Sequence, residues 1–171
     1  DKLTIDYYNK NAEKYILDTM NLHLVDQRDL FLSYLKKGSK ILDAGCGSGR
    51  DMVIFNKMGF SVTGFDASKE IALKASQHTG LYIDCQSFEN YNSNQKYNGI
   101  WACASLHHLS EDKLPEVITK LLNSLHRNGV FYLAFKKGDG VYRDDYNRLF
   151  LLLNKEKLMK LFENIKVNIS Y

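Results

Sequence analysis

The chain has 171 residues, which fits one domain, and 44% of them are hydrophobic, which predicts a folded core rather than disorder. Its net charge of +3 is small and its basic residues are dispersed, which argues against a nucleic-acid-binding protein. Cys46, Cys85 and Cys103 are widely spaced, which disfavours a disulfide framework or a zinc module and fits a reduced cytoplasm. No signal peptide or run of roughly 18 apolar residues is present, so we expect a cytoplasmic protein without membrane contact.

Two helices are predicted ahead of the first strand. The first runs from Thr4, expected as its cap, to about Asp18. The second begins near Leu24 and ends at Gly38. The second helix is expected to carry Leu30, Phe31, Tyr34 and Leu35 on its apolar positions.

These helices are expected to form a lid over a ligand site. Residues 1–38 would be the lid, and residues 39–171 the remainder of one domain. Tyr8 and Tyr15 lie on the first helix and could close on a bound ligand. The alternative is that both are ordinary packing residues, which is the commoner role of helix-spaced tyrosines.

A glycine-rich loop follows the first strand, which is predicted over 40–44. Gly45, Gly47 and Gly49 are spaced by two and lead into a helix that Gly59 ends. Alternate glycines let the backbone turn sharply and lie against a ligand, and the helix start presents free N–H groups to the same place. A dinucleotide fingerprint needs a small residue where Arg50 stands, so NAD is disfavoured.

An acidic residue ends the second predicted strand, which covers 60–66. Asp66 stands some 20 residues after the glycine loop, where doubly wound folds hydrogen-bond ribose hydroxyls. The alternative is that Asp66 caps the next helix, predicted from Ser68 to about His78. A third strand is expected over 81–85.

The remaining elements continue the alternation of strand and helix. After a polar connection over 89–96 with a shortened or missing helix, we expect a strand over 98–105 and then a helix that starts at Ser110 or Asp112 and contains Pro115. A turn at Asn128 and Gly129 leads into a strand over 130–135, and a mobile polar wall over 136–147 follows. The last expected elements are a helix through Leu158, Leu161 and Phe162 and a strand over 165–169. This order predicts an α/β fold with a mostly parallel sheet.

The pattern Asp43-x-Gly45-x-Gly47-x-Gly49 resembles motif I of the class I S-adenosylmethionine-dependent methyltransferases. The segment Leu106-His107-His108-Leu109 after the fourth strand also resembles that family, and the resemblance extends from Lys40 to about Phe135. It implies a Rossmann-like doubly wound sheet. The family usually adds a seventh, antiparallel strand, which we expect to be missing here, either because the chain is cut short or because a partner finishes the sheet edge.

The resemblance implies a cofactor, S-adenosyl-L-methionine, and its product S-adenosyl-L-homocysteine. The residues expected to contact it are Asp43, Gly45, Cys46, Gly47, Gly49, Asp66, Ala67, Ser68, Gln86, Ser87, Phe88, Ala104 and Tyr15. Asp84 is a second candidate for the adenine amino group, and Arg50 could hold the cofactor carboxylate or pair with a surface acid. An ordinary loop with Phe88 in the core is the alternative for 86–88.

His107 and His108 are the candidate catalytic residues, because histidine titrates near neutral pH and both follow the fourth strand at its ligand-binding end. A base helps when the methyl acceptor must lose a proton. The alternative is that the rings pack or orient the substrate. A zinc site from these histidines with Cys46 and Cys103 is disfavoured by their spacing, and no metal is expected.

We therefore predict a methyltransferase that acts on a small molecule by in-line displacement. An Asn-Pro-Pro-Tyr-type segment, which marks methyltransferases of adenine or glutamine amide nitrogens, is missing after the fourth strand, where Ser105 and Leu106 stand. The lack of a basic stripe argues against nucleic acid. A non-catalytic sensor of S-adenosylmethionine or S-adenosylhomocysteine remains the alternative, and the oligomeric state stays open.

Overall fold

The computed structural model describes residues 1–165 and 167–169 of the chain. The helices are α1 (Lys2–Lys10), α2 (Ala12–Thr19), α3 (Val25–Ser33), α4 (Arg50–Lys57), α5 (Lys69–Thr79), the 3-10 helix η1 (Leu106–His108), α6 (Leu114–Asn123) and α7 (Lys155–Lys160). The strands are β1 (Lys40–Ala44), β2 (Ser61–Asp66), β3 (Ile83–Cys85), β4 (Tyr97–Cys103), β5 (Leu125–Ala134), β6 (Gly140–Arg143) and β7 (Leu149–Leu152).

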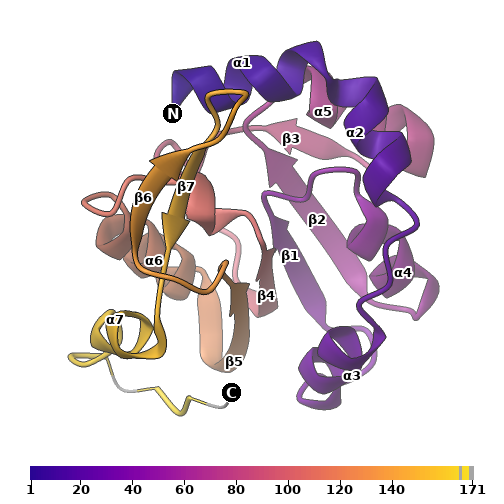
Figure 1. The fold of residues 1–171 in the computed structure, drawn as a ribbon. Coiled ribbons are helices and arrows are strands. Elements are labelled where there is room, and N and C mark those ends of the chain that lie inside the picture. Colours follow the sequence, from indigo (N-terminus) through magenta and orange to yellow (C-terminus); the bar gives the residue numbers. More distant parts are fainter. Residues whose placement is uncertain (166, 170–171) are drawn as a thin grey trace.

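The main sheet has five parallel strands in the order β3-β2-β1-β4-β5. This confirms the predicted α/β class and the mostly parallel sheet. From β1 the chain adds β2 and β3 on one side of the sheet, and then β4 and β5 on the other side. Ligands of open α/β sheets bind in the crevice between the two strands where this direction changes, here β1 and β4. Helix α1 lies across the carboxyl ends of these strands (Figure 1).

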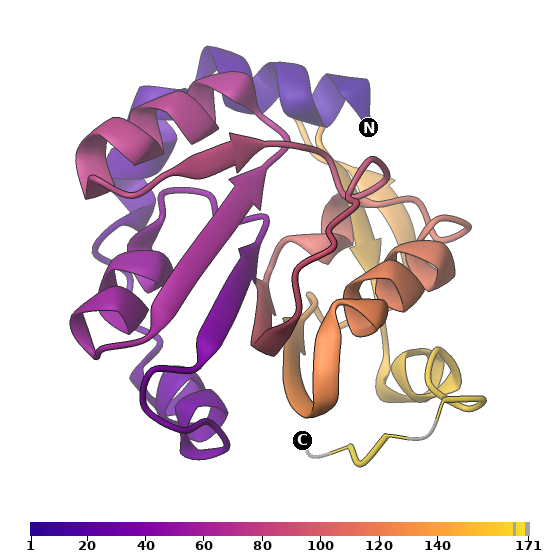
Figure 2. The same ribbon diagram turned by 180° about the vertical axis from the view of Figure 1, so that it is seen from behind.

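Side chains of the central strands alternate between two hydrophobic layers, as expected for strands covered on both faces. Ile41 and Trp101 pack with α3 and α4 on one face. Leu42 and Ile100 pack with α6 on the other face. Figure 2 shows α6 on the side of the sheet that is seen from behind.

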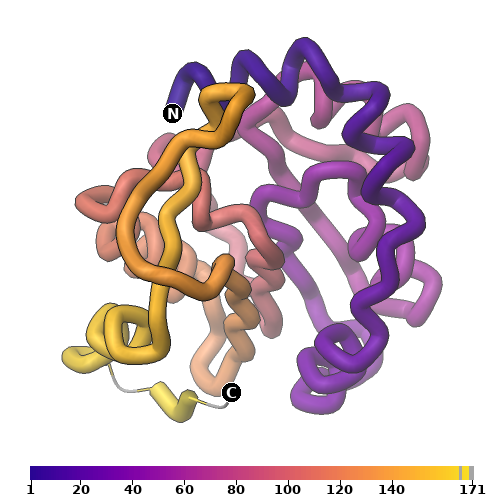
Figure 3. Tube along the Cα trace, viewed as in Figure 1, coloured from indigo at the N-terminus to yellow at the C-terminus, as the bar shows by residue number. Residues whose placement is uncertain are grey.

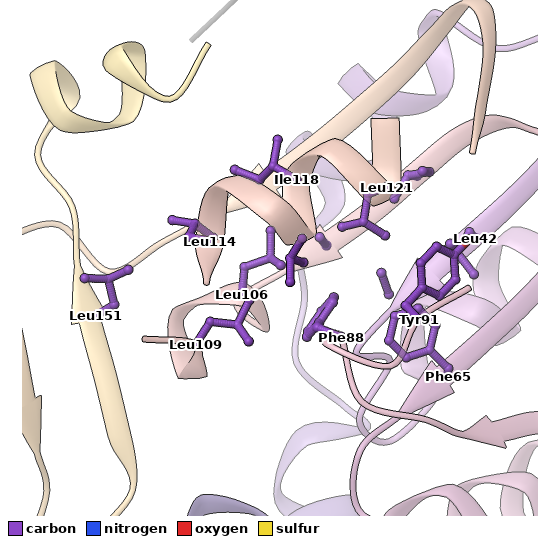
Figure 4. Close-up of a cluster of buried hydrophobic side chains, with 14 of the residues drawn as sticks. Leu42, Phe65, Phe88, Tyr91, Leu106, Leu109, Leu114, Ile118, Leu121 and Leu151 are labelled. Atoms are coloured by element: carbon purple, nitrogen blue, oxygen red, sulfur yellow. The ribbon is translucent and has the colours of Figure 1, made fainter. Parts of the chain in front are cut away.

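The connection between β3 and β4 lacks a helix, as the polar sequence over 89–96 predicted. Aromatic side chains cover the sheet in its place. Tyr91 stacks on Phe65 with ring centroids 5.1 Å apart, and Phe88 meets the edge of Phe65 at 5.2 Å (Figure 4). The hydroxyl of Tyr91 donates to Ser124 at the end of α6.

The first predicted helix is two helices, and its expected cap was wrong. Asp1 caps α1, because its carboxylate accepts from the backbone N–H of Thr4 at 3.1 Å, which places Thr4 inside the helix. The helix breaks at Asn11, where φ is −114° and ψ is 17°. There the side-chain amide donates to the carbonyl of Tyr7 at 2.9 Å and so competes with continued helix.

The second predicted helix is shorter than expected, and half of its predicted apolar positions are confirmed. It ends at Ser33; Phe31 is buried and Leu35 packs against the same cluster, but Leu30 and Tyr34 are 50% and 59% exposed. Arg28 is buried instead and forms an ion pair with Asp51 of α4 at 2.8 Å. This ion pair turns a charged residue inward, which apolar periodicity does not predict.

An antiparallel hairpin of β6 and β7 follows the main sheet, and its tip reaches α1 (Figure 3). The strand β7 was not predicted, and β6 lies inside the segment expected as a polar wall. The expected helix through Leu161 and Phe162 ends at Lys160. The strand expected over 165–169 was wrong, because Ile165 and 167–169 form no strand, and Lys166 lies outside the described residues. Among the described helices, none is long and apolar enough to cross a membrane.

Candidate functional site

A cavity that is partly open to solvent lies at the carboxyl ends of β1, β2 and β4. Helix α1 and the N-terminus of α5 also contribute to its wall. Ten of the residues that the sequence nominated line it: Tyr8, Tyr15, Gly45, Asp66, Ala67, Ser68, Ser87, Phe88, Ala104 and His108.

The glycine loop lines this cavity at its first glycine, Gly45. The backbone N–H groups of Gly45 and Cys46 both donate to the carbonyl of Phe65 at 2.9 Å, which ties the loop to β2. A Cβ added at Gly45 would lie 2.5 Å from that of Ser105, and φ at Gly45 is +73°. Both the close approach and the positive φ require glycine at this position.

Asp66 lies at the tip of β2 and holds the loop from the side. Its Oδ2 accepts from the N–H of Gly47 at 3.0 Å, and its Oδ1 accepts from the N–H of Ser68 at 2.9 Å. Ser68 itself caps α5 by accepting from the N–H of Ile71, so Asp66 is not the helix cap. Burial raises the pKa of Asp66 against the lowering effect of these N–H groups. Each oxygen of an ionised carboxylate still has a lone pair for a ligand hydroxyl.

Tyr15 brings a hydroxyl to the glycine loop. A Cβ at Gly47 would lie 2.8 Å from the Oη of Tyr15, so the ring rests directly on the loop. Burial raises the pKa of Tyr15, which keeps the hydroxyl protonated. This hydroxyl donates to no other group among the described residues. It is therefore a free donor at the wall of the cavity.

Asn9 connects α1 to the core and was not nominated from the sequence. Its Oδ1 accepts from the hydroxyl of Ser68 at 2.7 Å and from the N–H of Glu70 at 3.2 Å. The first turn of α5 is thus capped partly from another helix. No local pattern around Asn9 signals this long-range contact.

His108 also lines the cavity and lies between α1 and β7. Its Nδ1 is 2.7 Å from the carbonyl oxygen of Leu149, and its Nε2 is 2.9 Å from the Oη of Tyr8. Burial, together with the charges of Arg148 and Lys136, lowers the pKa of His108 to about 4, although its hydrogen bond to Leu149 acts in the opposite direction. The ring is therefore neutral near pH 7.

His107 lies behind His108 and does not line the cavity. Its Nε2 is 3.2 Å from the Nε2 of His108, and its Nδ1 is buried without a partner among the described residues. Burial, followed by the neighbouring His108, lowers the pKa of His107 to about 3. The two candidate catalytic histidines thus differ in their access to a ligand.

The remaining nominated residues lie outside the cavity wall: Asp43, Cys46, Gly47, Gly49, Gln86 and the second adenine candidate Asp84. Asp43 is buried below the loop, and burial, with the charge of Asp51, raises its pKa well above the ordinary value. Arg50 pairs with Asp51 at 2.6 Å, which is a buried acid and not a surface one. Within the described residues, no three His, Cys, Asp or Glu side chains are placed to hold a metal ion.

A signal for β7 was present in the sequence. The run from Leu149 to Leu153 is continuously apolar, and Asn147 and Asn154 bound it. Such a short apolar run is consistent with a buried strand. The contact of its first carbonyl with His108 had no such signal, because 41 residues separate the two positions.

Known proteins and solved structures resemble this chain. A family model described as a methyltransferase domain matches residues 13–163. The ubiquinone biosynthesis O-methyltransferase of Pasteurella multocida is 27% identical over 157 residues, which cover 78% of this chain and 64% of that protein. The chain thus spans less than two thirds of the length of this curated relative.

Solved structures share the fold. The 1,6-didemethyltoxoflavin-N1-methyltransferase of Burkholderia thailandensis was solved with bound 1,6-didemethyltoxoflavin and S-adenosylhomocysteine. It aligns with a TM-score of 0.79 at 19% identity, over 95% of this chain and 76% of that one. The magnesium protoporphyrin IX methyltransferase of Synechocystis, solved with S-adenosylmethionine, aligns with a TM-score of 0.71 at 16% identity, over 100% of this chain and 88% of that one. The fold is therefore the Rossmann-like methyltransferase fold, and because the family model spans most of its length, the chain belongs to the methyltransferase-domain family.

Proposed function

We propose that this protein binds S-adenosylmethionine in the cavity and transfers its methyl group to a small-molecule acceptor. The observation that carries the proposal is Asp66. Its carboxylate is held by the N–H groups of Gly47 and Ser68 at the tip of β2, next to the glycine loop. Two oxygens in fixed positions at this point of a doubly wound sheet suit the two hydroxyls of a ribose.

Other residues of the cavity fit the remaining parts of the cofactor. Phe88 offers an apolar ring and Ser87 a hydroxyl at the side where β3 ends, which suits an adenine. Tyr15 offers its free hydroxyl at the glycine loop, which suits the carboxylate of the methionine end. Hydrogen bonds to charged groups contribute about 1.5 to 3 kcal/mol each, which is enough to orient the ligand.

In this reaction the protein forms no covalent bond to the cofactor or the acceptor. The bound cofactor would supply an electrophilic methyl group on a sulfonium sulfur. Holding the acceptor in line with that methyl group accounts for as much as roughly 7 to 11 kcal/mol of the barrier. His108 and Tyr8 stand at the wall where an acceptor would enter.

A small acceptor is supported by the relatives. The curated relative is named for ubiquinone biosynthesis, and the Burkholderia neighbour was solved with 1,6-didemethyltoxoflavin, which are both small-molecule contexts. No basic stripe in the sequence supports a nucleic-acid acceptor.

Calorimetry with S-adenosylhomocysteine tests the proposal. The unmodified protein should bind it and should not bind NAD. Asp66→Asn should weaken binding at least about tenfold, the loss of roughly one charged hydrogen bond. Asp29→Asn is the control, because Asp29 is an exposed aspartate of α3 that lies outside the cavity wall. Equal effects of the two variants, or no binding at all, would contradict the proposal.

A further inference from the structure

Three elements that are far apart in the sequence meet at the acceptor side of the cavity. Tyr8 comes from α1, His108 from η1 and Leu149 from the start of β7. The Oη of Tyr8 lies 2.9 Å from the Nε2 of His108, and the Nδ1 of His108 lies 2.7 Å from the carbonyl oxygen of Leu149. The backbone N–H of Leu149 also donates to the hydroxyl of Thr4 at 2.9 Å, which fixes β7 against α1.

These contacts determine where the protons are. A carbonyl oxygen only accepts, so the Nδ1 of His108 must carry the proton that it donates to Leu149. The ring is neutral, so its Nε2 has a bare lone pair. Tyr8 is a phenol with a pKa raised by burial, so its hydroxyl donates to that lone pair at 2.9 Å, closer than the Nε2 of His107 at 3.2 Å. The hydroxyl oxygen of Tyr8 accepts from Arg148 at 3.4 Å and keeps a second lone pair that can accept a further proton.

Two titratable members of this group are open to a ligand. Tyr8 and His108 line the cavity, whereas His107 does not and contacts the Nε2 of His108. The neighbouring Phe150 is 3% exposed and packs against both histidine rings. A proton that leaves an acceptor in the cavity therefore meets Tyr8 or His108 first.

The strength of the base, rather than the charge of the cavity, separates the possible acceptors. Arg148 is paired with Asp144 at 2.7 Å, and neither Arg148 nor Lys136 lines the cavity, whereas Asp1, Asp66 and Glu89 do. An ammonium ion must lose its proton before its nitrogen can attack, and a histidine with a pKa of about 4 is too weak a base to remove it. A hydroxyl oxygen loses its proton as its new bond to carbon forms, when that oxygen is far more acidic.

We propose that Tyr8 and His108 form a proton relay for a hydroxyl acceptor, an alcohol or a phenol. This inference rests on the proposed methyltransferase function. The acceptor oxygen gains the methyl group that the sulfonium sulfur loses, and its own proton passes to the Oη of Tyr8. The original proton of Tyr8 passes to the Nε2 of His108. The Leu149 carbonyl holds the resulting imidazolium through Nδ1–H, and the extra proton then leaves to water.

A weakly basic histidine suffices for this step, because an oxygen becomes far more acidic as its new bond to carbon forms. The proton therefore moves with the methyl group or after it. His107 is a positioning residue in this arrangement, since it packs behind His108 and touches no ligand. The titratable and charged groups that face His108 are Tyr8 from α1, His107 from η1, Arg148 and Asp144 from the hairpin, and Lys136 after β5.

Nuclear magnetic resonance of isotope-labelled histidine in the complex with S-adenosylhomocysteine tests the relay without an acceptor. His108 should show a protonated Nδ1 and a bare Nε2 at pH 7. Tyr8→Phe should raise the pKa of His108, because the lost hydrogen bond stabilised the neutral ring. Tyr7→Phe is the matched control, since Tyr7 packs on Tyr8 and Arg148 but makes no hydrogen bond to His108. A protonated Nε2, or the same pKa in both variants, would overturn the relay.

Turnover tests the acceptor class. Product should form from a mixture of small phenols and alcohols and not from a mixture of primary amines at pH 7. Tyr8→Phe should lower that turnover about 100-fold, the lower range for one acid–base group, while Tyr7→Phe should leave it near the unmodified rate. Product from the amines alone, or an unchanged rate in Tyr8→Phe, would overturn the inference. If Tyr8→Phe still binds S-adenosylhomocysteine, such a result would overturn the relay and leave the proposed cofactor site intact. If the unmodified protein does not bind S-adenosylhomocysteine, the proposed function itself fails.

Discussion

The cavity has two halves that are built in different ways. The half at β1 and β2 comes from one continuous stretch of sequence, in which the glycine loop and Asp66 hold each other through backbone N–H groups. The half at Tyr8 and His108 comes from a helix, a 3-10 turn and a hairpin that are up to about 140 residues apart. Backbone geometry therefore defines the first half, and tertiary packing defines the second.

The largest effect should come from breaking the backbone half. Gly45→Ala should abolish S-adenosylhomocysteine binding and lower Tm, because the new Cβ would lie 2.5 Å from Ser105 at a φ of +73°. Gly80→Ala is the control, because Gly80 has a similar φ of +71° but open space around it. It should cost only the backbone strain of about 1 kcal/mol and leave binding intact. Unchanged binding by Gly45→Ala would show that the ligand does not bind against the glycine loop.

The side-chain half should affect chemistry more than cofactor binding. His108→Gln should lower methyl transfer about 100-fold, since an amide cannot take up the proton. Its affinity for S-adenosylhomocysteine should stay close to that of the unmodified protein in calorimetry. His78→Gln, a change at an exposed histidine of α5, serves as the control. If His108→Gln lowered the affinity and the rate by the same factor, the two halves of the cavity would not have separate roles.

The histidine pair should also give stability a pH dependence. Unfolded histidines take up protons near pH 6.5, whereas burial lowers the pKa of His108 to about 4 and that of His107 to about 3. Between these values the unfolded chain binds more protons, so the free energy of unfolding falls as pH falls from about 7 to 4. Urea titrations across this range should show the fall.

The double variant His107→Gln, His108→Gln isolates the contribution of the pair from that of the buried carboxylates. Its slope of stability against pH should be flatter than that of the unmodified protein. Equal slopes would mean that both rings can be protonated in the folded protein, which the burial of His107 argues against.

The smallest effect should come from the contact that joins the hairpin to α1. Thr4→Val removes the hydroxyl that accepts from the N–H of Leu149 and leaves that buried donor unpaired. The expected cost is about 1 to 3 kcal/mol in the free energy of unfolding, measured by urea denaturation. Thr119→Val on α6 is the control, because its hydroxyl only donates to a carbonyl of its own helix at an exposed position. Equal costs would show that the hairpin is not fixed through Thr4.

The same contrast explains what the sequence could predict. The strands β1, β2 and β4, the helices between them and the nomination of Asp66 follow from local signals, namely apolar runs, glycines and a terminal acid. The break at Asn11, the inward Arg28 and the hairpin follow from side-chain partners elsewhere in the chain. Leu149 contacts His108 through its backbone carbonyl, and because every residue has one, the residue type at this position does not predict the contact.

The nominated site residues divide in the same way. Asp66, Ser68 and Gly45 line the cavity because they end or follow strands of the sheet. His107 and His108 are adjacent in the sequence, and the tight turn of η1 sends one ring to the cavity and the other behind it. Which of two neighbours faces a ligand depends on the packing of Phe150 against both rings.

A crystal structure of the protein with S-adenosylhomocysteine tests the central claim most directly. The account predicts that the ribose hydroxyls lie within hydrogen-bond distance of the Asp66 carboxylate, with the sulfur directed toward Tyr8 and His108. Density for the nucleoside at any other surface, or a ribose that does not touch Asp66, would contradict it.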